Sequence, residues 1–427
     1  MPRRSPFTAI LLLLATAGGA DAENWPGWRG PRGDGTSSES GIPVEWDAAS
    51  GANTRWTTAV PGEGYASPVV WGDAILLVSC LTETQERLLL RLDRDTGDLV
   101  WQKTVLTAPL ETKHRLNSYA SGTPATDGEL IYVAFQEVDG HTIPAPNVGN
   151  ERPVTPGQVV LAAYDFDGEQ CWRREVGEFI SAHGFCSCPV LYGDLVIVNG
   201  DHDGDSYLVA LNRHTGDEVW RVSREHGIRS YVTPIIREYD GRTQMVLSGS
   251  QHIASYNPLD GSLHWKIDGP TEQFVASMID DGERLYVAAG FPTYHVMAID
   301  PAGRGNVTDT NVLWHRTEAH CYVPSPVVVD GYVFVANDDG IAHCFDAESG
   351  EHLWRTRLGR QYSASLVTAG GLVYFLSDEG ITSVIRPGPE PEVIAENAVG
   401  EFCAASPAIS QGMLLIRGET HLYCIAE

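Results

Sequence analysis

One recurring phrase constrains the fold of this chain more than any other feature. An Asp, Asn or similar residue opens a short turn that ends in Gly, and a Trp follows a few residues later. The clearest copies are "LDRDTGDLVW" (92–101), "LNRHTGDEVW" (211–220) and "FDAESGEHLW" (345–354). A Trp closes a related phrase at positions 56, 101, 172, 220, 265, 314 and 354. Most of the eleven tryptophans therefore mark one position in a repeating unit.

Each unit also begins with a recognisable signal, an aromatic residue followed by small residues and often Pro. It occurs eight times, starting at residues 65, 119, 185, 231, 274, 322, 362 and 402. The spacing of about 48 residues is typical of a four-stranded propeller blade. Apolar runs such as "AILLVS" (74–79) and "LVIVNG" (195–200) read as its strands. The sequence predicts an all-β fold, an eight-bladed β-propeller of four-stranded antiparallel blades.

The ends of the chain indicate how the ring closes. Trp56 precedes the first unit, whereas the last unit ends at "HLYCIAE" without an outer strand of its own. We expect the strand around Trp56 to complete the last blade, because an open ring would expose two sheet edges. We expect the tryptophan rings to pack between neighbouring blades, beside the Gly turns.

The first residues have the pattern of a secretory signal peptide. Arg3 and Arg4 precede an apolar core at 10–14, and "ADA" (20–22) is a small-residue cleavage site. We divide the chain into a signal peptide (1–22), an N-terminal extension (23–52) and the propeller (53–427). No later run reaches the roughly 18 apolar residues that a membrane span needs. The mature protein is expected in the periplasm or secreted, as a monomer.

Charge and cysteine content narrow the partners and the chemistry. The formal net charge is −27, which repels phosphate backbones, so nucleic acid and anionic membranes are poor partners. The eight cysteines are sparse for a disulfide framework in so long a chain. Most lie in strand-like apolar runs, and we expect the majority to be small buried core residues.

The repeat resembles that of a known family. The Asp-x-x-Thr-Gly-x-x-x-Trp phrase at 93–101, and at 212–220 with Asn first, is similar to the tryptophan-docking repeat of pyrroloquinoline-quinone-like (PQQ-like) β-propellers. The resemblance runs from about residue 54 to the end. This group includes quinoprotein alcohol dehydrogenases and the propeller lipoprotein of the outer-membrane assembly machinery. Residues 24–36, "NWPGWRGPRGDGT", resemble the leader of exported bacterial propellers with the same label. The resemblance implies the fold and leaves the function open.

Two functions follow from the resemblance. A quinoprotein dehydrogenase would need PQQ, Ca²⁺ held by Glu, Asn and Asp, a catalytic Asp and typically a vicinal Cys pair. The sequence has no Cys-Cys and no CxxCH haem motif, and its loops are short for enclosing a cofactor. We therefore expect a non-catalytic binding or scaffold module of the cell envelope, without a cofactor or metal site. Its partner would be an envelope protein segment, a glycan or a small ligand. The PQQ-dependent redox protein is the alternative.

The blade pattern also predicts a binding face. Connections between blades, and those between the second and third strands of a blade, lie on one rim of a propeller. The residue two before each opening aromatic should project there near the channel mouth. These positions are Glu63, Asn117, His183, Arg229, Glu272, His320, Arg360 and, in the eighth blade, Gly400 with Glu401 beside it. Their mixed charges fit either a ring of salt bridges or a surface that captures a ligand.

Three longer segments fall on the same rim: 102–118, the Pro-rich insertion 136–157, and 200–206. We expect the insertion to form part of the binding surface. Asp201, Asp203 and Asp205 have the spacing of a Ca²⁺ loop, but the sixth position is Ser206 and the twelfth is Asn212. A hairpin turn is the better interpretation. "NDDG" (337–340) and "SDEG" (377–380) hold the same place in later blades.

Overall fold

The computed structural model describes residues 22–427, and its helix-free secondary structure consists of β-strands joined by turns. The predicted signal peptide lies outside the described residues except for Ala22. None of residues 22–427 belongs to a helix that is long and apolar enough to cross a membrane.

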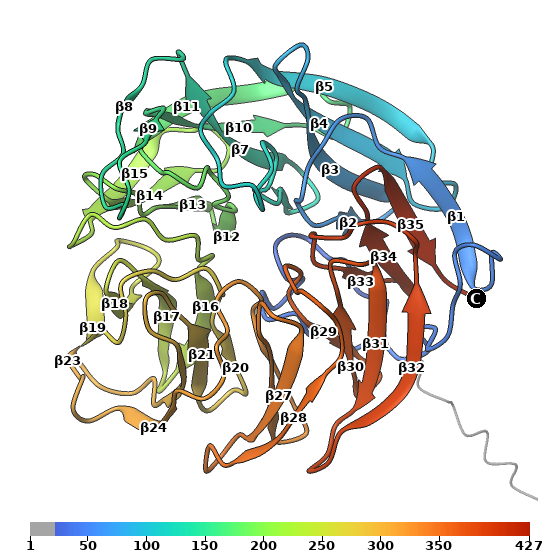
Figure 1. Ribbon diagram of the computed structural model, residues 1–427. Helices are drawn as coiled ribbons and strands as arrows, with labels where there is room; N and C mark the ends of the chain where they lie inside the picture. Colours follow the sequence, from blue (N-terminus) through green and yellow to red (C-terminus); the bar gives the residue numbers. More distant parts are fainter. Residues whose placement is uncertain (1–21) are drawn as a thin grey trace, which may run out of the picture.

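Eight antiparallel sheets stand around a ring, which confirms the predicted eight-bladed propeller (Figure 1). We number the sheets as blades one to eight and name their strands A to D from the centre outward. Blades one to four consist of β2 (Val69–Trp71), β3 (Ala74–Leu81), β4 (Glu86–Asp93) and β5 (Leu99–Thr107); β6 (Ala125–Thr126), β7 (Ile131–Val138), β10 (Gly157–Tyr164) and β11 (Gln170–Phe179); β12 (Val190–Tyr192), β13 (Leu195–Gly200), β14 (Tyr207–Asn212) and β15 (Glu218–Ser223); β16 (Ile235–Tyr239), β17 (Arg242–Gly249), β18 (His252–Tyr256) and β19 (Leu263–Asp268).

The second half of the ring repeats the same order. Blades five to eight consist of β20 (Ile279–Asp280), β21 (Leu285–Ala289), β22 (His295–Ile299) and β24 (Val312–Arg316); β25 (Val327–Val329), β26 (Tyr332–Ala336), β27 (Ile341–Asp346) and β28 (His352–Arg357); β29 (Val367–Ala369), β30 (Leu372–Leu376), β31 (Ile381–Arg386) and β32 (Glu392–Ala398); β33 (Ala408–Ser410), β34 (Met413–Arg417), β35 (His421–Ile425) and β1 (Thr54–Ala59).

The N-terminal strand closes the ring as predicted. β1 pairs antiparallel with β35, the last strand of the chain, with Trp56 opposite Cys424. The two strands lie side by side in Figure 1. The indole Nε1 of Trp56 then donates to the carbonyl of Arg94 in blade one at 3.0 Å. This contact joins the last blade to the first, and β1 covers the edge of β35 that would otherwise be left unpaired.

The tryptophans dock between blades in the predicted way. Trp314 of blade five donates from Nε1 to the Ala347 carbonyl of blade six at 3.0 Å. Its ring covers Gly350, where an added Cβ would lie 2.4 Å from the indole. The backbone of Gly350 also has a φ of 69°. The Gly of the repeat is therefore needed twice, for the turn and for the ring that rests on it.

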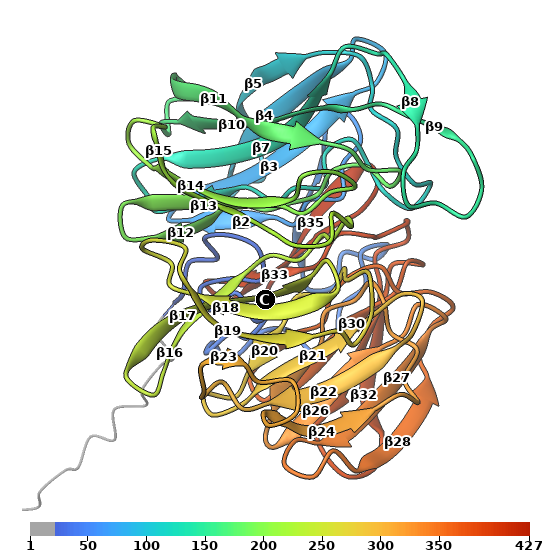
Figure 2. The same cartoon turned by 90° about the vertical axis from the view of Figure 1, so that its left-hand side faces the viewer.

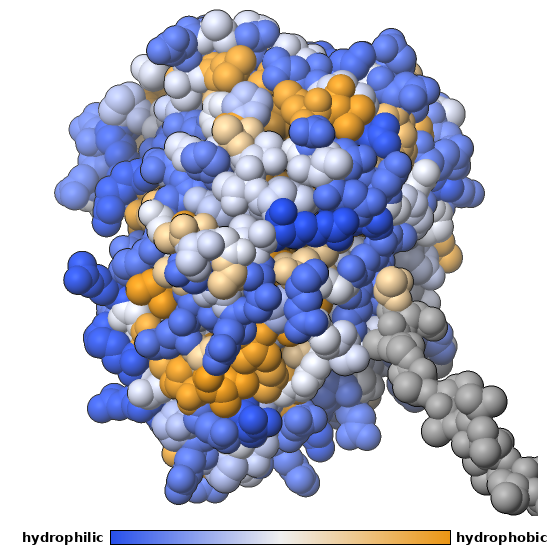
Figure 3. Space-filling model, turned by 90° about the vertical axis from the view of Figure 1, so that its right-hand side faces the viewer, coloured by the Kyte–Doolittle hydropathy of each residue, from blue (hydrophilic) through white to orange (hydrophobic). Residues whose placement is uncertain are grey.

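Burial follows the position of a strand within its blade. β3 and β13 are almost wholly buried, because each B strand packs on both neighbouring blades. β1 alternates between half-buried and exposed residues, because one face of an outer strand meets solvent. Figure 3 shows the side of the molecule that carries β1, where hydrophobic residues form separate areas among hydrophilic ones. Single exposed apolar residues such as Leu99 on β5 and Val393 on β32 are normal for such a surface.

Blade four departs from the regular pattern. It has a fifth strand, β23 (Gly305–Asn306), which pairs in parallel with β19 and comes from the connection within blade five. Trp265 lies on β19, and its Nε1 donates at 2.8 Å to Gln244 of its own blade. The extra strand and the altered contact both occur beside blade five. The connection between β22 and β24 of that blade lacks the Thr-Gly turn.

The cysteines confirm the expectation for the majority. Six of the eight are buried, and all eight are free thiols. Cys171 is exposed on β11, and Cys186 is partly buried in the channel wall. Burial raises the pKa of the Cys80 thiol to about 11, so this thiol stays protonated in the core.

Candidate functional site

The blade topology gives the ring two different rims. The top rim carries the D-to-A connections between blades and the B-to-C connections within them. The bottom rim carries the A-to-B and C-to-D turns. Figure 2 shows the ring from the side, with the small hairpin of β8 (Ile143–Pro144) and β9 (Pro153–Val154) projecting from the top rim. The hairpin belongs to the insertion at 136–157.

Within the channel, small residues of the blade openings link each blade to the next. The backbone N–H of Ser277 donates to Ser325 Oγ at 2.9 Å, that of Ser325 to Ser365 Oγ at 2.9 Å, and that of Ser365 to Ser406 Oγ at 2.8 Å. These bonds satisfy buried donors where no sheet ladder can reach. They explain why small and hydroxyl residues follow the aromatic residue of each opening.

The bottom rim is covered by a segment that we call the N-terminal seal, residues 23–40. Trp25 forms an isolated bridge with Val70 of blade one, and Thr36 forms one with Thr368 of blade seven. Trp28 donates from its indole to Ser277 Oγ of blade five at 3.2 Å. One short segment thus reaches blades on several sides of the ring.

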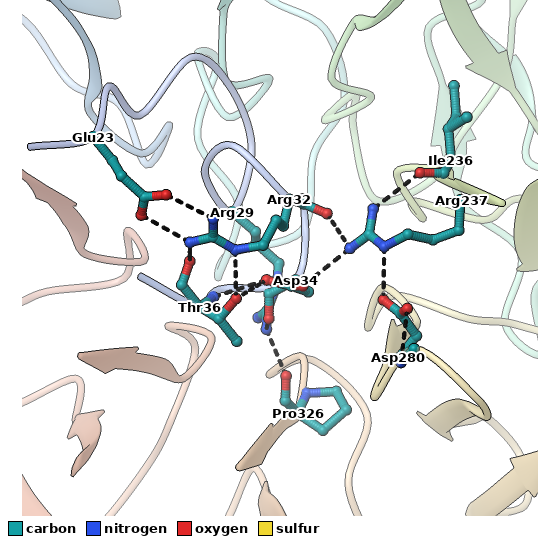
Figure 4. Close-up of polar contacts among 10 residues, drawn as sticks. Glu23, Arg29, Arg32, Asp34, Thr36, Ile236, Arg237, Asp280 and Pro326 are labelled. Carbon is teal, nitrogen blue, oxygen red and sulfur yellow. Dashed lines mark hydrogen bonds and ion pairs between the residues drawn. The ribbon is translucent and has the colours of Figure 1, made fainter. Parts of the chain in front are cut away.

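Arginines fix the seal at the centre of the ring (Figure 4). Arg29 is 1% exposed and donates to the carbonyls of Ser325, at 3.3 Å, and Pro326, at 2.5 Å. Burial lowers the pKa of Arg29 to about 10, so its guanidinium is still charged at neutral pH. Arg237 of blade four joins Asp34 of the seal, at 3.0 Å, to Asp280 of blade five, at 2.9 Å.

Toward the top rim lies a pocket that we call the channel pocket. Its volume is about 320 Å³, and each of the eight blade openings contributes to its wall. Its residues are Tyr65, His114, Leu116, Asn117, Ser121, His183, Cys186, Tyr231, Val275, Tyr322, Val323, Asp338, Ser363 and Ala404. Because the seal covers the other end of the channel, access to this pocket is from the top rim.

A second hollow adjoins it, which we call the rim cleft. It has a volume of about 810 Å³ and lies between the tip of the insertion, including Asn147 to Asn150, and blades three to six. Phe291, which is 47% exposed, stands in its wall. His183 and Tyr322 line both the rim cleft and the channel pocket. The two hollows are therefore neighbours on one face.

A buried ion pair holds the insertion in place. Arg229 is 3% exposed and pairs with Asp203 at 2.8 Å. The same guanidinium donates to the carbonyl of Asn147 at 3.1 Å, and the Asn147 amide donates to Asp203 at 3.2 Å. Charge-assisted bonds of this kind are stronger than neutral ones. The insertion is thus bound to blades three and four at its tip.

Two of the three aspartates with the Ca²⁺-like spacing form ion pairs with arginines. The Asp201 carboxylate forms an ion pair with Arg224, whose Nε lies 2.7 Å from Oδ1, and both side chains are fully buried. Asp203 receives Arg229. No cluster of three or more metal-ligating side chains occurs among residues 22–427. Residues 201–206 join β13 to β14, which fits the hairpin interpretation.

The structure places the nine predicted rim positions in different settings. His183 lines both hollows, Asn117 lines the channel pocket, and Arg229 and Glu272 line the rim cleft. The five outside both hollows are Glu63, His320 and Arg360, with Gly400 and Glu401 in blade eight. Within residues 22–427 no ion pair joins two of these side chains, so they do not form a ring of salt bridges.

Two hydrogen bonds link His183 to other predicted rim residues. The predicted connection 102–118 is shorter than expected, because β5 continues to Thr107. Asn117 donates to the His183 carbonyl at 2.8 Å, which ties this connection to blade three. Arg229 donates to His183 Nδ1 at 3.4 Å. Burial, followed by the charge of Arg229, lowers the pKa of His183 to about 3. His183 is therefore an uncharged hydrogen-bonding group of the site at neutral pH.

Comparison with known proteins decides the family. The model of the family described as outer membrane protein assembly factor BamB matches residues 36–151, 139–322 and 294–386, well over half of the chain. The chain belongs to this family. Its members include BamB of Yersinia pestis, which is 26% identical over 307 residues, or 64% of this chain and 72% of that protein. BamB of Alkalilimnicola ehrlichii is 24% identical over 214 residues, which is 47% of this chain and about half (51%) of that relative's length.

Solved structures show the same fold. The crystal structure of BamB from Moraxella catarrhalis aligns with a TM-score of 0.60 and 14% identity, covering 88% of this chain and 97% of that one. A europium-containing methanol dehydrogenase aligns with a TM-score of 0.64 and 12% identity, covering 92% of this chain and 89% of that one. These neighbours confirm the predicted propeller fold, and together with the family match they confirm a PQQ-like propeller related to the assembly-factor family.

The channel pocket does not fit a quinone cofactor held with Ca²⁺. Such a quinone carries carboxylates, yet no Lys or Arg lines the pocket, and its one acidic side chain is Asp338. The Asp338 carboxylate already accepts hydrogen bonds from the backbone N–H groups of Tyr322 and Val323, at 3.3 and 3.1 Å. A further anion beside it would meet like charge in a poorly solvated space.

Sequence reasoning did not single out the most informative residues of the pocket. The opening aromatics Tyr65, Tyr231 and Tyr322 marked the repeat, but nothing in their spacing showed that their rings line one hollow. Asp338 belongs to the "NDDG" turn. The sequence correctly predicted that this turn lies on the top rim, but it predicted no function for the turn. The N-terminal seal has no periodic signal, and the contacts that place it on the ring are with distant blades.

Proposed function

We propose that this protein is a binding or scaffold module of the cell envelope, and that its top rim holds a segment of a partner protein. The observation that carries the proposal is the pair of adjoining hollows, which share His183 and Tyr322 and are flanked by the insertion. Two adjoining hollows with an exposed aromatic side chain and polar walls suit a peptide that extends from one to the other better than a compact ligand.

Family membership and the N-terminal sequence support the proposal that the protein acts in the cell envelope. The relatives are named as outer membrane protein assembly factors. The predicted signal peptide at 1–22 would export the chain. On this basis the partner is a protein that takes part in assembling the outer membrane. Removal of the gene should then lower the amount of outer-membrane proteins, and unchanged amounts would contradict this finer proposal.

The insertion provides the direct test. Ile143 pairs with Val154, and the backbone N–H of Ala145 donates to the Arg152 carbonyl at 2.9 Å. Replacing residues 146–151 with Asn-Gly should therefore close the hairpin without disturbing β7 or β10. Replacing all of 136–157 would also remove Gln136, which is 1% exposed and hydrogen-bonds to Phe179. The shorter change separates binding from folding.

The measurement is retention of envelope proteins by the purified, immobilised mature chain. We expect the 146–151 replacement and Phe291→Ser to reduce the recovered partner at least tenfold. Val219→Ser is the matched control, because Val219 is an apolar residue of similar exposure, 52%, on the outer strand β15. It should retain the partner fully. Equal recovery by all four proteins, or no recovery by the unmodified chain, would contradict the proposal.

A further inference from the structure

The walls of the channel pocket are unusually rich in aromatic rings. Tyr65, Tyr231 and Tyr322 approach it from blades one, four and six. The Tyr231 hydroxyl is hydrogen-bonded to Ser181 Oγ at 2.8 Å, and the Tyr322 hydroxyl donates to Gln273 at 3.3 Å. Because these two hydroxyls already have protein partners, the rings themselves are what a ligand would meet. Ring faces carry partial negative charge.

A carboxylate without a counter-charge stands in the same wall. Asp338 lies in the B-to-C turn of blade six and accepts only backbone N–H groups among the described residues. Asp378 has the same place in blade seven, where it accepts the N–H of Ser363 at 2.7 Å. Within residues 22–427 no Lys, Arg or His forms an ion pair with either aspartate. A carboxylate in this setting costs free energy that a cation would recover.

The other ionisable groups of the wall do not offset this charge. Burial lowers the pKa of His114 and of His183, so both are neutral at pH 7. Arg229 stands at the margin of the pocket, but its charge is paired with Asp203. Burial raises the pKa of Asp338 to about 6, which leaves most of this carboxylate ionised at neutral pH. The pocket is therefore electronegative.

We propose that the channel pocket binds an organic cation, an ammonium or guanidinium head group, with Asp338 as its counter-charge and the three tyrosine rings as its walls. Cations within about 6 Å of an aromatic ring gain roughly 0.5–2 kcal/mol, most where water is excluded. A volume of about 320 Å³ accommodates a head group of trimethylammonium size. The net charge of −27 raises the local concentration of cations around the whole molecule.

The cation has two sources with the same chemistry. It is either a free small molecule or the Lys or Arg side chain of a partner segment that lies in the adjoining rim cleft. The second source rests on the proposed function, whereas the first does not. Binding of small probes is therefore measured separately from partner retention, so failure of one proposal does not mimic failure of the other.

The test uses the mature protein and isothermal titration with matched probes. Choline is compared with 3,3-dimethylbutan-1-ol, a neutral molecule of nearly the same shape. Arginine amide is compared with citrulline amide in a second arm. We expect at least one cationic probe to bind ten times more tightly than its neutral counterpart. A preference for arginine amide points to a side chain, and a preference for choline points to a free cation. Equal binding of both pairs, or no binding of either cation, would overturn the proposal.

Variants locate the site. Asp338→Asn keeps an oxygen for the two backbone N–H groups and should weaken cation binding at least tenfold. Asp339→Asn removes the same charge from the exposed neighbouring residue and should change binding less than twofold. Tyr65→Leu, at a partly exposed ring, should weaken the cation more than its neutral analogue. Unchanged cation affinity in Asp338→Asn, or equal losses in the two aspartate variants, would place the cation elsewhere and overturn the assignment.

Discussion

The glycine of the repeated turn shows how one residue serves two blades. In four of the regular turns an added Cβ would lie under 3 Å from the tryptophan of the preceding blade. The sequence predicted this packing because Gly and Trp recur together. It could not predict Trp265, whose indole bonds within its own blade, since that difference depends on the extra strand β23.

Two glycine substitutions test this account. Gly331 has a positive φ of 79° with no atom near an added Cβ, so Gly331→Ala should cost about 1 kcal/mol of unfolding free energy from backbone strain alone. Gly350→Ala adds a clash with Trp314 and should cost about 2–4 kcal/mol. Urea unfolding measures both variants. Equal losses would mean that the ring does not restrict this position.

Asp338 makes a testable contribution to pH dependence. Burial raises its pKa from 3.8 to about 6 in the folded protein, so the folded state favours the protonated form. Its destabilising effect is therefore full above pH 6 and disappears as the pH falls below 3.8. Buried histidines such as His183, whose pKa is lowered, act in the opposite direction below pH 6.5. Only a comparison between variants isolates the aspartate.

We expect Asp338→Asn to be more stable than the unmodified chain at pH 7.5, with the advantage shrinking as the pH falls through 6 toward 4. Unfolding free energies measured at several pH values provide the comparison, with Asp339→Asn as the control for loss of a nearby exposed charge. An advantage that stays constant with pH would show that Asp338 is not the group responsible.

At the scale of elements, the repeats were predictable and the additions to them were not. Eight openings, the tryptophan phrases and the closing strand are local signals with a fixed period, and the structure confirms them. The N-terminal seal, the β8–β9 hairpin and β23 depend on contacts with distant residues, such as that of Trp28 with Ser277. A single sequence does not contain such pairings. For the same reason the rim could be located, while the residues that meet in its hollows could not.

Two truncations separate the closing strand from the seal. A chain that begins at residue 41 lacks the seal but keeps β1, so it should remain soluble and unfold cooperatively at a lower temperature. A chain that begins at residue 63 also lacks β1 and exposes the edge of β35. It should aggregate and lose its cooperative transition. Calorimetry and light scattering measure both. A soluble chain from residue 63 with an unchanged melting curve would contradict closure by β1.

At the scale of the whole molecule, the two ends of the channel differ: one is covered by the seal, and the other carries the hollows. The seal occupies the bottom rim through Arg29 and Arg237 (Figure 4). The top rim carries both hollows and the insertion. The net charge of the chain, −27, favours cationic partners over nucleic acid. The central claim is that partners meet only the top rim.

Site-specific photo-cross-linking in living cells tests this claim most directly. A photoreactive residue is placed at Asn150 or Phe291 in the rim cleft, at Asp330 on the bottom rim, or at Val219 on an outer strand. All four positions are exposed, so they are equally able to react. We expect one shared partner protein to be cross-linked from positions 150 and 291 and none from 330 or 219. Cross-links to a partner protein from 330 or 219, or none from positions 150 and 291, would contradict it.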